Sequence, residues 1–352
     1  MAARSADAAP NSRGRKKAKL KAPAKAKAPA SRKAHADAPA AAKAPAIRSK
    51  YGPEGPLQGP FPIPPNDLLG AHVSSAGGTH EAPLRARSIA ASAMQIFSKQ
   101  ANRWAERECL DGECVEFRAA LGTTSVAATI AHDSYLINLA SPDPVLRSRS
   151  IDSFAAELRR CDALGLQYLV SHPGNFMDER EAGITRNADG ITEALERVPG
   201  NVVVCMETTV GSGTSIGGTF EELAELLNRV GASVRHRVGV CVDTCHVYSA
   251  GYDLVGDYDG VWARFDETIG RDTLKVMHLN DSKTPFGSHR DRHELIAEGS
   301  LGAIPFQRIM TDARLAAIPK VIETPKLDDP ETTDRRMLER LRSYLAAGAE
   351  AR

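Results

Sequence analysis

The stretch GVCVDTCHVYSAGYDL, residues 239–254, places chemically active side chains directly after an apolar run. Its beginning is typical of a buried strand, and Asp243, Cys245 and His246 follow at the end of that strand. A carboxylate, a thiol and an imidazole can bind metals and transfer protons. One polar residue at the end of a buried strand is usually a hydrogen-bonded core group. The meaning of this stretch therefore depends on how the other strands end.

Eight apolar runs along the chain end in a similar way. The runs are LLGAHVS, SAMQIFS, SVAATIAHDS, QYLVSHPG, VVVCMETT, VGVCVDTCH, LKVMHLND and KVIETP. They end at or near His72, Ser98, His132, His172, Glu207, Asp243, His278 and Glu323. Seven of these eight residues are His, Asp or Glu, and so many ionisable groups in one place are costly unless something compensates their charge and desolvation. We therefore predict one shared site.

The elements that must position these residues alternate between two types. Runs of four to eight apolar residues without polar alternation indicate strands buried on both faces. The segments between them, such as IDSFAAELRRCDALG and TFEELAELLNRVG, have helical spacing of apolar residues,. Eight strand–helix repeats predict an α/β fold, a (β/α)8 TIM barrel. A doubly wound open sheet is the alternative, but no glycine-rich phosphate loop follows the first strand,.

In such a barrel all strand carboxyl ends meet at one mouth, where active sites lie. Imidazoles mixed with carboxylates favour a divalent transition metal, and the histidine content favours zinc over magnesium. His246 is expected in the loop after its strand, and HRDRHELIAEG adds a second acid and imidazole pair. The predicted metal ligands are His132, His172, Glu207, Asp243, His246, His278, Asp291, His293 and Glu323. This set is too large for one tetrahedral ion and suits two or three.

Composition bounds the class of protein. The chain has 352 residues, 42% of them hydrophobic, enough for one large domain or two ordinary ones. It has no run of 18 apolar residues and no apolar signal segment, so we expect neither membrane insertion nor secretion.

The six cysteines form no Cys-x-x-Cys pair, and Cys205 and Cys241 lie in apolar runs, which indicates buried thiols in a reducing compartment,. Cys241 and Cys245 remain alternative metal ligands. We expect a cytoplasmic, nucleoid-associated protein, with a nuclear or organellar location left open.

Charge is divided unevenly along the chain. Residues 1–50 hold 14 Lys or Arg against two Asp or Glu, a net charge of +12, whereas the remaining residues carry −11. This Lys/Ala/Pro-rich segment has almost nothing to bury, so we predict a disordered tail. Residues 51–66 are predicted to be a Pro/Gly-rich linker, and 67–345 the barrel domain. A flexible basic arm is attracted to polyanions, which predicts a non-specific DNA contact. A solubilising tail or a processed targeting segment is the alternative.

The motifs of the predicted barrel resemble those of the endonuclease IV family of apurinic/apyrimidinic endonucleases. The matching stretches are GAHVSSAGG, HDSYLINLA, SHPG, GVCVDTCHVYSAGYDL, MHLNDSKTPFGSHRDRHELIAEG and VIET. Together they span roughly residues 67–325. The resemblance implies a zinc-dependent deoxyribonuclease that holds three zinc ions in a deep pocket. It also implies that the partner is double-stranded DNA containing abasic sites, and we expect a monomer.

The resemblance further implies how the ligands divide among the ions. The three implied sets are His132, His172 and Glu207; Glu207, Asp243, His278 and Glu323; and His246, Asp291 and His293. The implied reaction is hydrolysis of the phosphodiester bond 5′ to an abasic site, leaving a 3′-hydroxyl and a 5′-deoxyribose phosphate, with removal of 3′ blocking groups as a related activity. Zinc would activate water and stabilise charge on the phosphate. Glu207 and Glu323 are the predicted catalytic residues, which orient that water or accept its proton.

Loops above the barrel are expected to contact DNA. By the resemblance, such loops enter the minor groove and hold the abasic nucleotide outside the stack. The predicted DNA contacts are Gln100, Asn102, Arg103, Tyr135 and Leu136. Packing over the barrel rim is the alternative for Tyr135 and Leu136. Family members commonly show Lys-Asn near residue 99 and an arginine near 102, whereas Gln100 and Asn102 stand here, which leaves the individual contacts open.

Two other functions remain open. A sugar isomerase or epimerase on a related barrel also places His, Glu and Asp at strand ends, but with one or two metals and no use for His246, Asp291 and His293. A non-catalytic DNA-binding protein would account for the basic tail but not for nine converging ligands. Metal content distinguishes the two enzyme classes, because the endonuclease hypothesis requires three ions.

Overall fold

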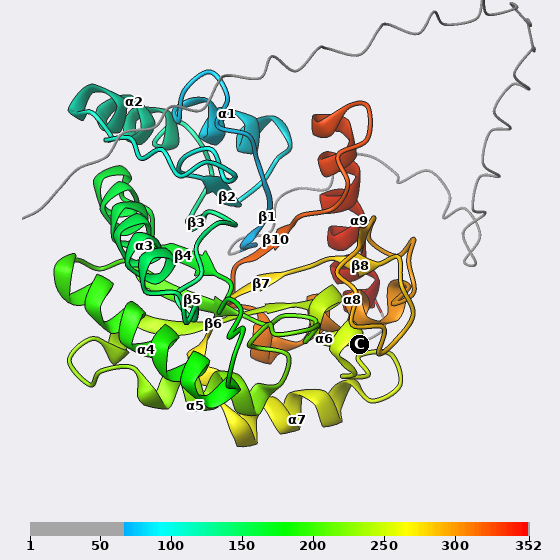
Figure 1. Cartoon of the computed structure of the whole chain (residues 1–352). Coiled ribbons are helices and arrows are strands. Elements are labelled where there is room, and N and C mark those ends of the chain that lie inside the picture. The colour runs from blue at the N-terminus through cyan, green and yellow to red at the C-terminus, as the bar shows by residue number, and fades with distance from the viewer. Residues whose placement is uncertain (1–66, 351–352) are drawn as a thin grey trace, which may run out of the picture. The chain divides into compact units, whose positions relative to one another are not determined.

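A closed barrel of eight parallel strands forms the centre of the protein (Figure 1). The computed structural model describes residues 67–350, and side chains as far as residue 345. The strands follow one another around the barrel in the order β1-β10-β7-β6-β5-β4-β3-β2. They are β1 (Leu69–His72), β2 (Ala93–Phe97), β3 (Ala128–His132), β4 (Tyr168–Ser171), β5 (Val203–Glu207), β6 (Val238–Asp243), β7 (Leu274–His278) and β10 (Lys320–Ile322). The predicted TIM barrel is confirmed.

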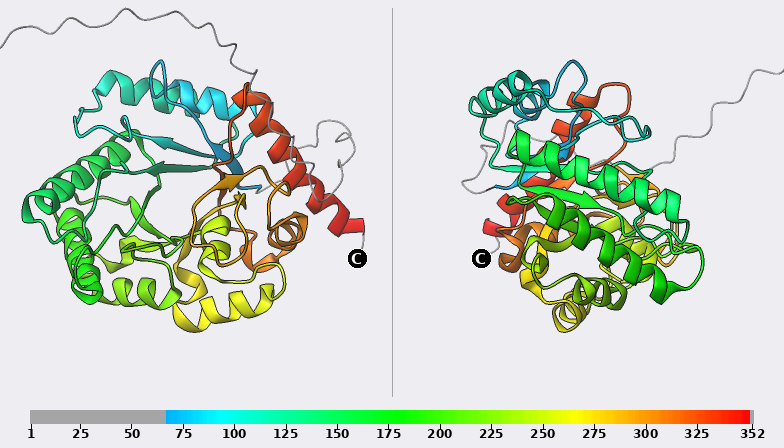
Figure 2. Two further views of the ribbon diagram at one scale, coloured as in Figure 1. Left: turned by 45° about the vertical axis from the view of Figure 1, so that its right-hand side comes forward. Right: turned by 60° about the vertical axis from the view of Figure 1, so that its left-hand side comes forward.

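Helices surround the strands, as both views in Figure 2 show. The α-helices are α1 (Glu81–Ser88), α2 (Asp111–Leu121), α3 (Pro144–Leu164), α4 (Arg180–Arg197), α5 (Phe220–Arg229), α6 (Thr244–Ala250), α7 (Tyr258–Thr268), α8 (Ala303–Thr311) and α9 (Pro330–Glu350). Short 3₁₀ turns lie at Arg235–Arg237, Arg271–Thr273 and Ala313–Leu315. Local sequence sets several helix ends: Asp143 caps α3, Thr219 caps α5, and Gly165 ends α3 in the left-handed conformation,.

Two apolar layers hold the barrel together. The larger lies between strands and helices and includes Phe154, Ile184 and Leu223. The smaller fills the barrel interior with inward-facing side chains, which are Ala93, Ala128, Ile130, Val170, Cys205, Cys241, Val276 and Val321. Successive side chains of a strand alternate between its faces, so the residue two positions beyond this inner layer also faces inward. In seven strands, or directly after them, those residues are Gln95, His132, His172, Glu207, Asp243, His278 and Glu323.

One predicted strand end is therefore wrong. The apolar run indicates Ser98 as the polar end of the second strand, but Ser98 follows β2 out of phase with the inward positions Ala93 and Gln95. The Ser98 hydroxyl instead contacts the carboxylate of Glu157, and the guanidinium of Arg160 donates to it at 2.8 Å; both partners lie on α3. Strand β2 thus presents a buried amide to the interior rather than a hydroxyl.

The segment after β6 also differs from the prediction. The sequence predicts His246 in a loop, but this residue lies in the short helix α6, because the Asp243 carboxylate caps that helix. Farther along, β8 (Asp281–Ser282) and β9 (His293–Glu294) pair as a small antiparallel sheet that the sequence did not predict. The pairing of Ser282 with His293 ties the 283–292 loop to the end of β7. Helix α6 brings His246 to the barrel mouth, and the pairing of β8 with β9 brings His293 there.

The remaining predictions concern the N-terminal segment, the cysteines and membrane-spanning helices. The predicted tail, residues 1–50, and the linker, residues 51–66, lie outside the described residues, so both stay predictions. All six cysteines are described and free, and Cys205 and Cys241 are buried as expected. Within residues 67–350, none of the helices has the length and apolar character needed to cross a membrane.

Candidate metal centre

The nine predicted ligands come together at the carboxyl ends of the strands. Their side-chain donor atoms form groups in which all atoms lie within 4.8 Å of one another. Three of these groups are His132, His172 and Glu207; Glu207, Asp243, His278 and Glu323; and His246, Asp291 and His293. These groups coincide with the three sets that the family resemblance implies. Glu207 belongs to the first two, so its carboxylate joins them.

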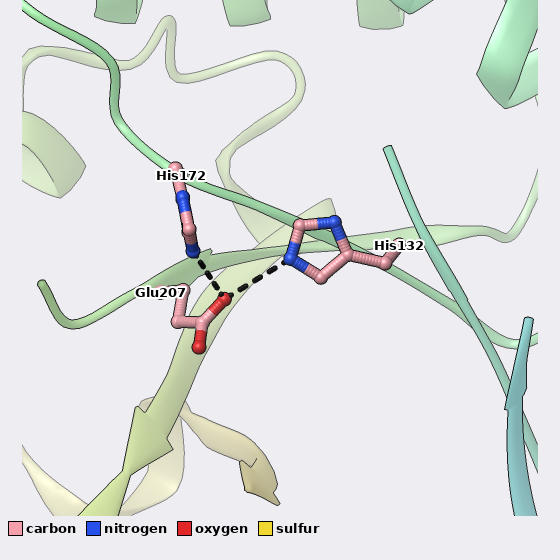
Figure 3. A group of neighbouring side chains, drawn as sticks. All are labelled: His132, His172 and Glu207. Atoms are coloured by element: carbon pink, nitrogen blue, oxygen red, sulfur yellow. Dashed lines mark hydrogen bonds and ion pairs between the residues drawn. The ribbon is translucent and has the colours of Figure 1, made fainter. Parts of the chain in front are cut away.

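The first group is drawn in Figure 3. His132 Nε2 lies 3.2 Å and His172 Nε2 lies 3.0 Å from the same oxygen, Glu207 Oε2. Glu207 is completely buried and His132 nearly so, whereas the side chain of His172 is 38% exposed. The group therefore reaches from the interior to the solvent at the mouth.

The second group lies deeper in the barrel. His278 Nδ1 is 2.9 Å from Glu207 Oε1 and 3.3 Å from Glu323 Oε2. The third carboxylate, that of Asp243, is 3.9 Å from the same nitrogen. Its Oδ2 accepts a hydrogen bond from Asn280 Nδ2 at 2.7 Å. The side-chain carbonyl of Asn280 in turn accepts from the backbone N–H of Glu323 at 2.8 Å, so one amide holds two members of the group.

The third group is the most open of the three. His246 Nε2 lies 3.3 Å from Asp291 Oδ2, and His293 Nε2 lies 3.2 Å from Asp291 Oδ1. Asp291 is 48% exposed, whereas His246 is buried in α6. His293 Nε2 is also 3.6 Å from Asp243 Oδ2, which links this group to the second.

Hydrogen bonds fix the protonated nitrogen of four histidine rings. Three rings donate from Nδ1 to a backbone carbonyl: His132 to Asp133 O at 3.0 Å, His246 to Thr208 O at 2.8 Å, and His293 to Glu323 O at 3.3 Å. The fourth ring, His278, donates from Nε2 to the side-chain oxygen Gln95 Oε1 at 2.8 Å. These oxygens only accept, so each bonded nitrogen carries hydrogen and the other one faces the carboxylates. His293 Nε2 is buried and makes no well-oriented hydrogen bond among the residues that the structure describes. Nitrogens fixed in this way are suited to metal binding.

The buried carboxylates of the cluster are stabilised by positive charge nearby. Burial opposes ionisation of Glu207, but the neighbouring His278 and His172 hold its pKa well below the usual range. Burial also lowers the pKa of His132, but Glu207 overcomes this effect and raises it to about 10. The carboxylates thus stay ionised and draw protons onto the rings. A divalent cation would supply the same charge and displace those protons, so the donor set fits zinc.

The two candidate thiols also lie close to the cluster. Cys241 groups with Glu207 and His278, and Cys245 groups with Asp243 and His293. Burial raises the pKa of both thiols, that of Cys245 to about 12. A thiol binds a metal as the thiolate, so the carboxylates of the same groups are the better donors.

The predicted DNA contacts lie on loops above the mouth. Gln100, Asn102 and Arg103 are exposed in the loop after β2, and Leu136 is half-buried. Tyr135 is 64% exposed, although its ring and that of Phe97 form a T-shaped contact with 5.3 Å between the centroids. Tyr135 thus packs at the rim, as its alternative predicted, and its exposed surface leaves the predicted DNA contact open to a partner.

Sequence reasoning missed the amides that support the ligands. Gln95 lies in SAMQIFS, whose composition indicates an apolar strand, and Asn280 lies in HLND directly after a ligand strand. The alternation of each strand would have found Gln95, because it is the second residue after the inward Ala93,. His72 is not a member of any ligand group; its Nδ1 lies 3.3 Å from Glu323 Oε1.

Comparison with known proteins agrees with this architecture. The family model described as "Xylose isomerase-like TIM barrel" matches residues 84–344. Probable endonuclease 4 of Geobacter sulfurreducens is 43% identical over 270 residues, which cover 76% of this chain and 90% of that protein. Probable endonuclease 4 of Chloroflexus aggregans is 43% identical over 281 residues, covering 79% and 97%.

Solved structures give the same result. Endonuclease IV from Thermus thermophilus superposes with a TM-score of 0.71 at 32% identity, covering 79% of this chain and 99% of that one. A D-tagatose 3-epimerase-like protein has a TM-score of 0.61 at 15% identity, covering 80% and 99%, which shows a shared fold alone. On these similarities, the chain belongs to the endonuclease IV family and is an enzyme of that family.

Proposed function

We propose that this protein is a DNA-repair endonuclease that hydrolyses the phosphodiester bond 5′ to an abasic site. The products are a 3′-hydroxyl and a 5′-deoxyribose phosphate, and the same site removes 3′ blocking groups. The observation that carries this proposal is the cluster of nine donors at the barrel mouth, in which ring nitrogens fixed by hydrogen bonds face ionised carboxylates. Membership of the endonuclease IV family supports it independently.

The proposed cofactor is three zinc ions per chain, one for each of the three donor groups. Imidazole nitrogens suit zinc better than magnesium, which prefers oxygen ligands alone. Each group offers at least three donors, and the exposed edges of His172 and Asp291 leave an approach from solvent. When bound, zinc ions lower the pKa of water and stabilise negative charge on a phosphate group.

Two carboxylates have distinct proposed roles. Glu207 Oε2 faces His132 and His172, and Glu207 Oε1 faces His278, so this buried carboxylate sets the spacing between the first two groups. Glu323 lies nearer the mouth, with 18% of its side chain exposed, where it can orient a water molecule or accept its proton,. Both are proposed as catalytic residues.

The proposed partner is double-stranded DNA that contains an abasic site. The exposed Tyr135 and the loop with Gln100, Asn102 and Arg103 lie where a duplex would approach the mouth, and Leu136 follows Tyr135. We further propose that the chain acts as a monomer in the cytoplasm, close to the nucleoid. Its basic residues 1–50 would add a non-specific DNA contact.

One assay tests the proposal. A duplex with a single tetrahydrofuran abasic analogue is incubated with protein that carries zinc, with and without a chelator, beside an intact duplex. We expect a single incision 5′ to the analogue that is lost after metal removal, and three zinc ions per chain by metal analysis. A fully loaded protein that leaves the analogue intact would refute the proposal. One or two metals together with turnover of a ketose would instead identify an epimerase.

A further inference from the structure

Gln95 is a polar residue at an inward position of β2, in the same alternation as the inner-layer residue Ala93. Its side chain is completely buried. The register of β1 and β2 places it opposite His72. A buried amide is costly unless its polar atoms are hydrogen-bonded, so the partners of Gln95 indicate why the strand carries it.

Both ends of this amide contact predicted ligands. Gln95 Nε2 donates to Glu323 Oε1 at 2.6 Å and lies 3.0 Å from His72 Nδ1. Gln95 Oε1 lies 2.8 Å from His278 Nε2. An ionised carboxylate can only accept, so Glu323 requires the NH₂ end of the amide, and the carbonyl end faces His278.

The carbonyl of Gln95 determines which nitrogen of His278 carries hydrogen. Because Oε1 only accepts, Nε2 is the protonated nitrogen, and the lone pair of the neutral ring lies on Nδ1. Nδ1 is the nitrogen that lies 2.9 Å from Glu207 Oε1 and 3.3 Å from Glu323 Oε2. The opposite tautomer would turn an N–H toward the carboxylates and a lone pair toward the carbonyl, which prevents metal binding at that position.

We propose that Gln95 is a positioning residue for the second donor group. Its single amide fixes the tautomer of His278 and holds the carboxylate of Glu323 beside the same ion. His72 accepts the remaining amide hydrogen and so steadies Gln95, which explains a histidine at the mouth that is outside the ligand groups. This inference rests on the proposed metal-dependent function and adds a residue that does not touch the reacting atoms.

Two variants separate the two tasks of the amide. Gln95→Met removes both hydrogen-bonding ends in a side chain of similar length. Gln95→Glu keeps an oxygen for His278 but replaces the donor toward Glu323 with a second negative charge. Gln167→Met is the matched control: Gln167 precedes β4, its side chain is exposed, and its Oε1 accepts from the backbone N–H of Thr129 at 3.1 Å, outside the donor groups.

Each variant is purified as the full chain, loaded with zinc and examined in four ways. The measurements are zinc release to a colorimetric chelator, the histidine tautomers by long-range ¹H–¹⁵N NMR of ¹⁵N-histidine-labelled protein, circular dichroism, and kcat and KM on the abasic duplex. For Gln95→Met we expect one zinc equivalent to leave about 10–100-fold faster, a mixed His278 tautomer, and a lower kcat with little change in KM. Gln95→Glu should keep the tautomer but still release zinc faster than the wild type. Gln167→Met should match the wild type.

The outcomes distinguish this inference from the proposed function. Wild-type zinc release and an unchanged tautomer in Gln95→Met would overturn the role of Gln95, even if the wild type cleaves abasic DNA. If Gln95→Met fails to fold, the test rests on Gln95→Glu. Wild-type zinc release in that variant would overturn the proposal that the NH₂ group of Gln95 holds the carboxylate of Glu323. A zinc-loaded wild type that leaves abasic DNA intact refutes the endonuclease function, whereas the zinc-release comparison still tests Gln95.

Discussion

The carboxylate of Asp243 begins the helix that carries His246: Asp243 Oδ1 accepts the backbone N–H of His246 at 3.0 Å. The same oxygen accepts the N–H of Cys245 at 2.7 Å, so it caps α6. The other oxygen, Oδ2, faces Asn280 and the ring of His278. One side chain thus has a structural role and a proposed ligand role, and a substitution can separate them.

Asp243→Asn should retain the helix and lose activity. An asparagine caps a helix about as well as an aspartate, but it removes the negative charge beside His278. We expect incision to fall about 10–100-fold or more with little change in urea stability. Asp243→Ala should lose activity and, in addition, about 1 kcal/mol of stability. Asp143→Ala, which removes the cap of α3 outside the cluster, is the control and should lose stability alone. Wild-type incision by Asp243→Asn would contradict the ligand role.

Glu207→Gln should remove nearly all incision while the barrel stays folded. The amide has no charge and offers one acceptor oxygen in place of two, so it cannot serve both the His132 side and the His278 side. Loss of ligand orientation typically lowers activity or metal affinity about 10–100-fold. Glu157→Gln is the matched control, because Glu157 is also buried but pairs with Arg160 on α3. That variant should be less stable yet active per folded molecule; wild-type activity in Glu207→Gln would exclude a bridging role.

Metal removal should abolish incision and lower thermal stability together. Ions that bind only the native state stabilise it, by about 2.7 kcal/mol at a free concentration 100 times Kd. Zinc should restore activity and Tm, and magnesium should not, because the donors include five imidazoles,. EDTA should act slowly on the loaded protein, since several ligands share each ion. Full activity of stripped protein with magnesium alone would show that zinc is not the cofactor.

Removal of residues 1–50 should weaken DNA binding without changing lesion selectivity. The segment has a net charge of +12, and each neutralised phosphate contributes about −0.9 to the slope of log K against log salt. Affinities for intact and abasic duplexes should fall by similar factors and the slope should flatten, whereas the rate at saturating substrate should hardly change. Titrations of both duplexes across a salt series measure this. A loss confined to abasic DNA, or an unchanged slope, would indicate another role.

The strands and the places of the candidate ligands at their ends could be predicted because each has a strong local signal. A buried parallel strand is an apolar run, and an ionisable residue such as Glu207 or His278 interrupts that run at its carboxyl end. The sequence of β2 carries no such signal, since Gln95 is uncharged and two more apolar residues follow it. The apolar run therefore points to Ser98 as the end of that strand. Strand alternation, rather than the end of the apolar run, identifies Gln95 as an inward-facing residue,.

Short elements could not be predicted in the same way. Helix α6 has seven residues, too few for apolar spacing to appear. The Asp243 cap begins it, and the burial of six of its seven residues stabilises it,. Strands β8 and β9 have two residues each and are defined by their pairing across the 283–292 loop. The hydrogen bonds that orient the rings depend on tertiary contacts, such as that of His246 with the backbone of Thr208.

Strand pairing and the proposed metal loading are coupled in this chain. The second donor group takes one residue from the end of each of β5, β6, β7 and β10, which are neighbours around the barrel, so it is complete only when these four strands have paired. The first group likewise joins three separate strands. A chain whose strands have not yet paired therefore lacks both groups. Metal uptake should follow assembly of the sheet, and the bound ions should then slow its unfolding.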